Sequence, residues 1–279
     1  MAEGRAGRDL PRLGASNRRF RLIRQLAQRK GRAALGLTLV EGARLTVTAA
    51  AAGAGFEMLL LTEEHAHRPP PVLGRLIDAG VEAYVVTEEV LRRAAATLNP
   101  QGILGIVRIP GAQIPGPPFD RQTAFLCLDG VADPGNAGTL IRGADAAGMS
   151  GVIMGGGVDA WNPKVLRAAM GSTFHLPVQG TAAAETGELL ADLRGAGCRV
   201  ICASPRAGYS FWETDLGGPS VLVLGNEAWG VGPRVLDQAD ALVSIPNFGR
   251  VESLNVAQAG TLLMYEMARQ MRWLDGAVE

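Results

Sequence analysis

The chain has 279 residues, of which 47% are hydrophobic and 19% charged, and its formal net charge at pH 7 is zero. This composition excludes an intrinsically disordered chain and a coiled coil, and it predicts a globular protein of one large or two modest domains. Residues 47–56 form the longest weakly polar stretch, far short of the ~20 residues of a membrane span, and no apolar segment follows the N-terminal arginines as in a secretory signal. We therefore expect a cytoplasmic protein without a transmembrane helix.

Three cysteines bear on the compartment and on metal binding. Cys127, Cys198 and Cys202 form neither a C-x-x-C pair nor an even disulfide set. In a cytoplasmic protein such cysteines are free thiols. We therefore expect no disulfide and no bound metal.

Residues 1–32 form a basic arm with ten basic and two acidic side chains, so they carry a net charge of +8 and the remaining chain −8. Such an arm is typical of a segment that binds a polyanion such as RNA, and a solvated helix or a frayed tail is the alternative. Apolar residues at helical spacing predict an amphipathic helix that docks on a domain and is capped by Asn17. These apolar residues are Phe20, Ile23, Leu26 and Ala27. The basic candidates for RNA contact are Arg18, Arg19, Arg21 and Arg24, with Arg44 and Lys164 further along the chain.

Residues 33–108 predict a small α/β domain. Apolar runs at residues 58–61 and 83–86 indicate strands, and residues 43–51 and 88–98 have helical patterns. Residues 109–118 contain four prolines, two glycines and no charge, which is typical of a semi-rigid linker. We place the linker at residues 109–120 and a second domain at residues 121–279.

In the second domain, strand-like runs alternate with helical ones. Apolar strands separated by helices predict a parallel sheet covered on both faces, with ligands bound in loops at the carboxyl ends of the strands. His175 lies in one strand-like run, and we interpret all three histidines as structural or solvent-facing. The predicted strands are residues 123–128, 151–154, 199–203, 220–224 and 241–245. The predicted helices are residues 138–147, 186–193 and 256–274, with another that begins near Pro163 and is capped by Asn162.

Three loops concentrate many of the 37 glycines. Residues 128–148 contain a predicted turn at Pro134-Gly135-Asn136 and place Arg142 one turn into the following helix. Residues 224–233 and 245–260 form the other two loops. Glycines expose backbone hydrogen-bonding groups, and Glu227, Ser253 and Asn255 add polar side chains, which suits a nucleoside-like ligand.

The standard nucleotide and hydrolase motifs are absent from the sequence. There is no G-x-x-x-x-G-K-[ST] and no G-x-G-x-x-G after a strand, so ATP and NAD lack support. A G-x-S-x-G elbow and an H-E-x-x-H motif are also missing, which argues against serine acyl transfer and zinc proteolysis.

The ordered motifs of the second domain resemble those of the SpoU/TrmH family in the SPOUT superfamily. They are N-x-G-x-x-x-R at Asn136, Gly138 and Arg142, then residues 162–178, then G-N-E-x-x-G at residues 225–230, and I-P-x-x-G-x-x-E-S-L-N at residues 245–255. The sequences VEGARL at residues 40–45 and PQGILGIVR at residues 100–108 are similar to the ribosomal-protein-like substrate-binding domain of rRNA-modifying members. The resemblance implies an α/β fold: a small N-terminal α/β substrate-binding domain and a C-terminal parallel-sheet SPOUT domain with a deep trefoil knot.

The resemblance also implies a cofactor, a partner and a set of site residues. The cofactor is S-adenosylmethionine, and members of the family work as homodimers. Asn247 departs from the pattern, because many relatives have an apolar residue there. The implied catalytic residues are Arg142, Asn136, Glu227, Ser253 and Asn255. The implied cofactor-binding residues are Leu224, Gly225, Asn226, Gly230, Ile245, Pro246, Ser253, Leu254 and Asn255.

The activity that the resemblance implies is methylation of a ribose 2′-hydroxyl, with 23S rRNA preferred because of the N-terminal domain. The alternatives are a tRNA methyltransferase, a non-catalytic RNA-binding or ribosome-assembly factor, and a small-molecule α/β enzyme that uses another nucleotide. Several of these residues also have a purely structural interpretation. Arg142 could be an ion-paired helix residue, and Asn136 could only form a turn. Core or interface packing is the alternative to base stacking for Phe211, Trp212 and Trp229. The sequence does not choose between a housekeeping and an antibiotic-resistance role.

Overall fold

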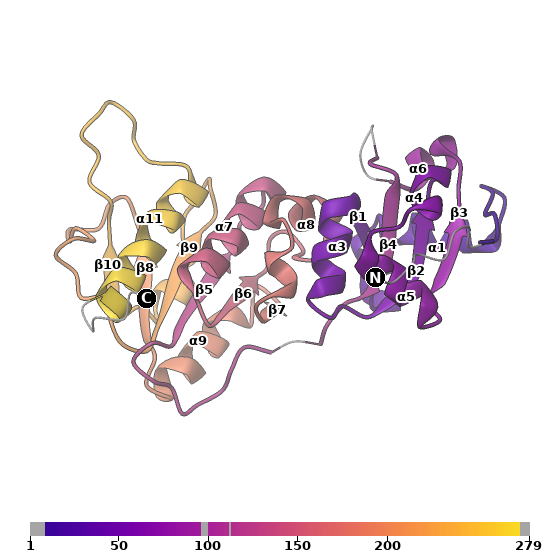
Figure 1. Cartoon of the computed structure of the whole chain (residues 1–279). Coiled ribbons are helices and arrows are strands. Elements are labelled where there is room, and N and C mark those ends of the chain that lie inside the picture. Colours follow the sequence, from indigo (N-terminus) through magenta and orange to yellow (C-terminus); the bar gives the residue numbers. More distant parts are fainter. Residues whose placement is uncertain (1–8, 96–99, 112, 274–279) are drawn as a thin grey trace. The chain divides into compact units, whose positions relative to one another are not determined.

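The computed structural model describes residues 9–95, 100–111 and 113–273 (Figure 1). The chain divides into two compact units: Met1–Gly111 with Trp161–Phe174, and Ala112–Ala160 with His175–Glu279. The first crossing between the units lies inside the predicted linker at residues 109–120. The segment Trp161–Phe174 packs with the first unit although both of its flanks belong to the second.

The first unit contains a four-stranded mixed sheet with the strand order β1-β4-β2-β3. Strand β4 runs antiparallel to both β1 and β2, and β2 and β3 are parallel. The strands are β1 (Leu37–Glu41), β2 (Phe56–Leu61), β3 (Glu82–Val85) and β4 (Ile103–Arg108). The helices of this unit are α1 (Arg18–Leu26), α2 (Arg29–Leu35), α3 (Ala43–Ala51), α4 (Glu63–His67), α5 (Pro71–Asp78), α6 (Glu88–Ala94) and α8 (Pro163–Ala169), followed by the 3₁₀ turn η1 (Ser172–Phe174).

The predicted amphipathic helix of the basic arm is confirmed as α1. The Asn17 side chain accepts a hydrogen bond from the Arg19 backbone N–H at 2.9 Å and so caps the helix. Phe20, Ile23 and Leu26 are buried in one core cluster together with residues of the sheet. Each such side chain contributes about 1.5–3 kcal/mol when fully buried, so the described part of the arm is integral to the first unit.

The second unit contains six strands in the order β10-β8-β9-β5-β6-β7, and every neighbouring pair is parallel. The predicted parallel sheet is therefore confirmed. The strands are β5 (Ala124–Asp129), β6 (Gly151–Gly155), β7 (Val178–Thr181), β8 (Arg199–Ala203), β9 (Ser220–Gly225) and β10 (Ala241–Val243). The helices are α7 (Pro134–Ala147), α9 (Thr186–Gly195), α10 (Pro233–Leu236) and α11 (Val256–Ala268), and the π-helical turn η2 (Arg269–Trp273) follows α11.

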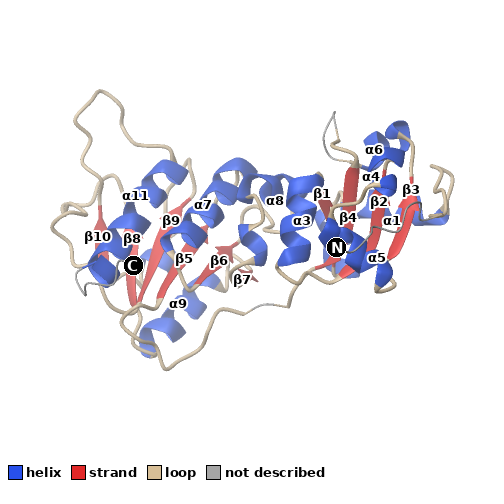
Figure 2. Ribbon diagram, in the orientation of Figure 1, coloured by secondary structure: helices blue, strands red, loops and turns tan. Residues whose placement is uncertain are grey.

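Helices cover both faces of this sheet, as Figure 2 shows. Phe125 and Val223 share a core cluster with Leu190 of α9 and Val235 of α10. On the opposite face, α11 approaches so closely that a Cβ at Gly260 would lie 2.4 Å from side-chain carbons of both Leu140 in α7 and Leu224 in β9. The successive residues Val223 and Leu224 of β9 therefore meet helices on opposite faces, as the pleat of a sheet requires.

Several element ends differ from the sequence prediction. Helix α7 begins at Pro134 rather than Gly138, so the predicted turn at Pro134-Gly135-Asn136 is wrong. The Asp133 side chain accepts a hydrogen bond from the Asn136 backbone N–H at 2.8 Å, and proline suits the first helical position because it has no N–H to leave unpaired. Asn136 therefore lies in the first turn of α7 and not in a loop.

Strand β10 ends at Val243 rather than Ile245, because the Ser244 backbone N–H donates instead to the Tyr209 carbonyl at 2.9 Å. His175 lies in a turn rather than a strand, and its Nδ1 is 2.9 Å from Asp145 Oδ2. Helix α6 ends at Ala94, and α11 ends at Ala268. The predicted ends of these two helices, residues 98 and 274, lie outside the described residues.

Candidate active site

Two of the glycine-rich loops leave the sheet from neighbouring strand ends. Asp129, the last residue of β5, is paired in register with Gly225, the last residue of β9. From β5 the chain continues to β6 and β7 on one side of the sheet, whereas β9 lies on the other side. Loops that diverge at the carboxyl ends of parallel strands form the usual ligand site of such a sheet.

A chain of side-chain hydrogen bonds joins all three candidate loops. The Asn136 Nδ2 group donates to Glu227 Oε1 at 3.0 Å, and Asn255 Nδ2 donates to Asn136 Oδ1 at 3.0 Å. Asn255 Oδ1 accepts from the Ala257 backbone N–H at 2.9 Å and so caps α11. The structure thus brings together Asn136, Glu227 and Asn255, three of the five predicted catalytic residues.

The Glu227 carboxylate is an anchor for the loop after β5. It accepts hydrogen bonds from the backbone N–H groups of Ala132 at 3.2 Å and Asp133 at 3.4 Å. Partial burial raises the pKa of Glu227, but the hydrogen bonds from Asn136 and from backbone N–H groups outweigh it and hold this pKa below its ordinary value. Glu227 is therefore ionised at neutral pH and poorly suited to act as a general base.

Arg142 lies on the exposed surface of α7, more than two turns from the start of the helix. Among the described residues it has no ion pair and no side-chain hydrogen bond, so the reading as an ion-paired helix arginine finds no support there. Its guanidinium group is free to bind a phosphate or an oxyanion.

The loop after β9 is tightly folded. Asn226 and Gly230 exchange two backbone hydrogen bonds of 2.9 Å, and the Asn226 side chain donates to the Gly130 carbonyl at 2.8 Å. A Cβ at Gly225 would lie 2.1 Å from the carbonyl carbon of Gly230, so only glycine fits there. Leu224, just before it, is buried.

One residue of this loop's framework escapes the sequence analysis. The buried Asp129 accepts a hydrogen bond from the Gly232 backbone N–H at 2.7 Å, which ties the end of β5 to the far side of the loop after β9. The sequence does contain a signal for Asp129, because it is an acidic residue at the end of an otherwise apolar strand.

The third loop, residues 245–255, is more open. Ile245, Pro246 and Leu254 are half-buried, and Ser253 is exposed. Asn247 Nδ2 donates to the carbonyls of Val251 at 3.4 Å and Glu252 at 3.1 Å. The residue that departs from the family pattern thus folds the loop back on itself.

The basic candidates for RNA contact have different surroundings. Arg19 pairs with Glu82 and lies over the Tyr84 ring at 5.2 Å, so part of its charge is already engaged. The Lys164 backbone N–H donates to the Asn162 side chain at 3.0 Å, which confirms the N-cap reading of Asn162. Arg18, Arg21, Arg24, Arg44 and Lys164 are exposed.

The aromatic residues divide between packing and exposure. Phe211 is buried, whereas Trp212 and Trp229 are 57% and 73% exposed. Trp212 stacks on Phe248, with ring centroids 6.2 Å apart. Core packing is therefore confirmed for Phe211, whereas packing of Trp212 and Trp229 at an interface stays a prediction.

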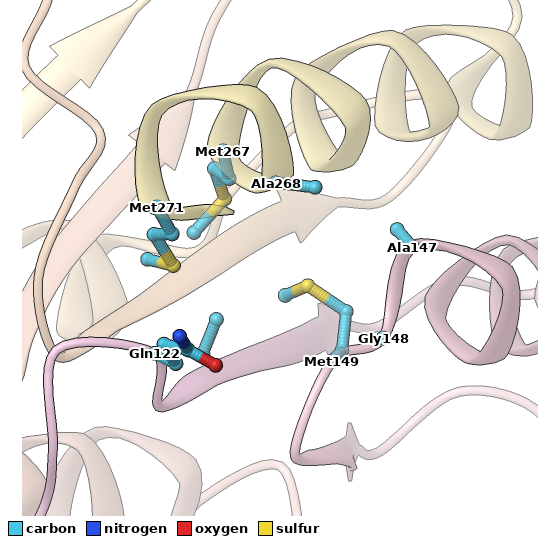
Figure 3. Close-up of a pocket in the computed structure, with 8 residues that line it drawn as sticks. Gln122, Ala147, Gly148, Met149, Met267, Ala268 and Met271 are labelled. Atoms are coloured by element: carbon cyan, nitrogen blue, oxygen red, sulfur yellow. The ribbon is translucent and has the colours of Figure 1, made fainter. Parts of the chain in front are cut away.

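Other features of the described residues do not add to this site. They contain no group of three or more histidine, cysteine or acidic residues arranged to hold a metal, and no helix long and apolar enough to cross a membrane. Figure 3 shows a small cavity lined by Gln122, Met149, Met267 and Met271, at one end of α11. Its volume of about 10 Å³ is enough for one water molecule at most.

A parallel sheet with glycine-rich loops at its carboxyl edge is typical of α/β proteins that bind a nucleotide-like ligand. The model of the SpoU rRNA Methylase family matches residues 123–265. The model of the MRM3-like substrate binding domain matches residues 17–105. The chain belongs to the SpoU rRNA methylase family and has an MRM3-like substrate-binding domain before its catalytic domain.

Relatives resemble the chain over nearly its whole length. An uncharacterised tRNA/rRNA methyltransferase of Synechocystis sp. is 36% identical over 90% of both chains. The 23S rRNA (guanosine(2553)-2′-O)-methyltransferase RlmP of Bacillus subtilis is 31% identical over 91% of this chain and 97% of its own. The crystal structure of an AdoMet-bound rRNA methyltransferase from Sinorhizobium meliloti has a TM-score of 0.82 and 29% identity over 95% of this chain and 97% of its own.

Proposed function

We propose that the chain transfers a methyl group from S-adenosylmethionine to a ribose 2′-hydroxyl of 23S rRNA. The observation that carries this proposal is the hydrogen-bonded chain Glu227–Asn136–Asn255, which joins three loops at the carboxyl edge of the sheet. Family membership and the rRNA-modifying relatives support the reaction. The substrate-binding domain that precedes the catalytic domain favours rRNA over tRNA.

The residues of two loops fit S-adenosylmethionine. The backbone of Gly230 and Val231 packs directly on Gly225, so the loop after β9 has a fixed shape, and Ser253 in the other loop is exposed for hydrogen bonding. When bound, this cofactor supplies an electrophilic methyl group on a sulfonium. The residues that would hold it are Leu224, Gly225, Asn226, Gly230, Ile245, Pro246, Ser253, Leu254 and Asn255.

Arg142 is proposed to act on the RNA rather than as a general base. A guanidinium group stays protonated in proteins and is therefore a poor proton acceptor. A fixed positive charge binds the phosphate next to the reactive ribose and stabilises the oxyanion that develops on the 2′-oxygen as the hydroxyl proton passes to water. Asn136 and Asn255 hold the loops in place, and the positioning of the two reactants supplies much of the acceleration.

We further propose that the protein is a homodimer, that its second unit is knotted, and that it is cytoplasmic. Leu262 and Tyr265 on α11 are 46% and 49% exposed, which supports a homodimer that covers this helix. The deep trefoil knot of the family is proposed for the second unit. A cytoplasmic location is supported by the ribosomal RNA substrate and by the free cysteines Cys127, Cys198 and Cys202.

The test is transfer of labelled methyl from S-adenosylmethionine to protein-free 23S rRNA, 16S rRNA and bulk tRNA, with Arg142→Ala as the control. We expect label in 23S rRNA that the substitution abolishes. Label in tRNA alone would mean that the substrate is tRNA and not 23S rRNA. Calorimetric binding of S-adenosylmethionine without transfer to RNA or assembled subunits would favour a non-catalytic factor, and no binding would refute the cofactor.

A further inference from the structure

The first unit contains a hollow of about 370 Å³ outside the candidate active site. Glu41 and Arg44 reach it from the end of β1 and the start of α3, Gln101 from the segment before β4, and Arg167 and Met170 from the end of α8. A volume of this size lies within the range of small-molecule pockets, roughly 300–1,000 Å³. The hollow is therefore large enough for one nucleotide-sized group.

Two arginines line the hollow, one paired with a carboxylate and one not. Arg167 Nη1 is 3.1 Å from Glu41 Oε2, and the Glu41 side chain is only 4% exposed. Arg44 is exposed, and no carboxylate of the described residues pairs with it. A partner that presents an anion to Arg44 therefore displaces no existing ion pair.

Met170 gives the hollow an apolar wall at a cost in backbone strain. Its φ of +53° is left-handed, and among the described residues it is the single non-glycine residue with positive φ. The position ends α8, where glycine or asparagine is usual. A methionine there places a flexible, polarisable thioether at the hollow, which the aliphatic residue Leu45 also lines.

We propose that this hollow binds one unpaired nucleotide of the RNA substrate. The base packs between Met170 and Leu45, the Gln101 amide hydrogen-bonds a base edge, and Arg44 binds the phosphate. A base inside a duplex is stacked and paired and does not enter such a hollow, so the site selects a bulged or looped nucleotide. This inference rests on the proposed function in one respect, namely that the substrate is RNA.

The test compares a fluorescent hairpin RNA that carries a one-nucleotide bulge with the same hairpin fully paired, and measures binding to the full chain by anisotropy. The bulge is made with each of the four nucleotides. We expect at least one bulged hairpin to bind about 10-fold more tightly than the paired one, a difference typical of a single well-fitted contact. Equal affinity for all five RNAs would overturn the proposal.

Two variants identify the hollow as the source of that preference. Arg44→Ala is expected to lower the affinity for the bulged hairpin several-fold. It should also reduce the slope of log affinity against log salt concentration by about 1. Met170→Gly relieves the left-handed strain, so we expect an equal or higher Tm together with a lost bulge preference. Arg75→Ala, on the exposed face of α5, is the matched control.

The outcomes separate this inference from the proposed methyl transfer, because binding is measured without S-adenosylmethionine. A bulge preference that Met170→Gly abolishes supports the hollow even if no methyl transfer occurs. A bulge preference that survives both variants would show that the hollow does not bind the unpaired nucleotide, and it would leave the methyltransferase proposal intact.

Discussion

Asn136 donates its side-chain amide to the Glu227 carboxylate at 3.0 Å, although the two residues lie 91 positions apart in the chain. The same amide accepts a hydrogen bond from Asn255 through its oxygen. Because one side chain uses both ends of its amide, the orientation of Asn136 is fixed. The three loops of the candidate site are therefore coupled, and disturbing one is expected to disturb the others.

The first prediction concerns this coupling. Asn136→Ala is expected to lower methyl transfer about 100-fold, since even a small misplacement of reacting groups has an effect of that size. Loss of two side-chain hydrogen bonds is expected to lower the free energy of unfolding by about 1–3 kcal/mol. Single-turnover methyl transfer and thermal unfolding measure the two effects. The exposed Glu188→Gln on α9 serves as the control, and wild-type activity in Asn136→Ala would contradict the coupling.

The second prediction concerns pH. The pKa of Glu227 is lower in the folded than in the unfolded chain, where it is about 4.3, so its stabilising contribution is complete above that value and disappears as the pH falls through the folded pKa. We expect Glu227→Gln to have a lower Tm than the wild type at pH 7 and a much smaller difference at pH 3. Because Glu227 is largely exposed, the contribution is modest. A Tm difference that grows on acidification would mean that the folded pKa is raised instead.

The third prediction concerns the tight loop after β9. Gly225→Ala places a Cβ 2.1–2.4 Å from the backbone of Gly230 and Val231, where no flexible side chain can move aside. We expect a loss of at least about 1–3 kcal/mol in the free energy of unfolding. At about 2–4 °C per kcal/mol, this is a fall in Tm of several degrees. Gly180→Ala on β7, with open space around its Cβ position, is the matched control and should leave Tm nearly unchanged.

A cofactor measurement accompanies this third experiment. If the loop holds S-adenosylmethionine, Gly225→Ala should also weaken its binding in calorimetry below the unfolding temperature. An unchanged affinity for S-adenosylmethionine in the folded variant would mean that this loop is not part of the cofactor site.

The sequence predicts the parallel sheet because its strands are continuous apolar runs. Every residue of β5 is buried, and such a run between helical segments is a local pattern. The starting point of α7 is missed because Pro134-Gly135-Asn136 suits both a turn and a capped helix. The choice depends on Asp133, whose side chain bonds Asn136 in the folded chain.

Long-range packing is the part that the sequence does not reveal. Thr38 Oγ1 donates to the Trp161 carbonyl at 2.6 Å across 123 positions, and Glu41 pairs with Arg167 across 126. No local periodicity encodes either contact, so the packing of Trp161–Phe174 with the first unit is not predictable from spacing. The acidic residue Asp129 can be noticed in the sequence, but its partner Gly232, 103 positions away, cannot be predicted from spacing.

The last prediction distinguishes two roles for Arg142 by a pH–rate profile. If its guanidinium acts as a fixed positive charge, Arg142→Lys keeps a charge but loses the planar fork that grips a phosphate, so we expect at least a 10-fold loss of rate with an unchanged profile. If Arg142 were the general base, lysine, with its lower ordinary pKa, would retain near-normal activity with a basic limb moved toward about 10.4. Rates measured between pH 6 and pH 10 under single-turnover conditions decide between these profiles.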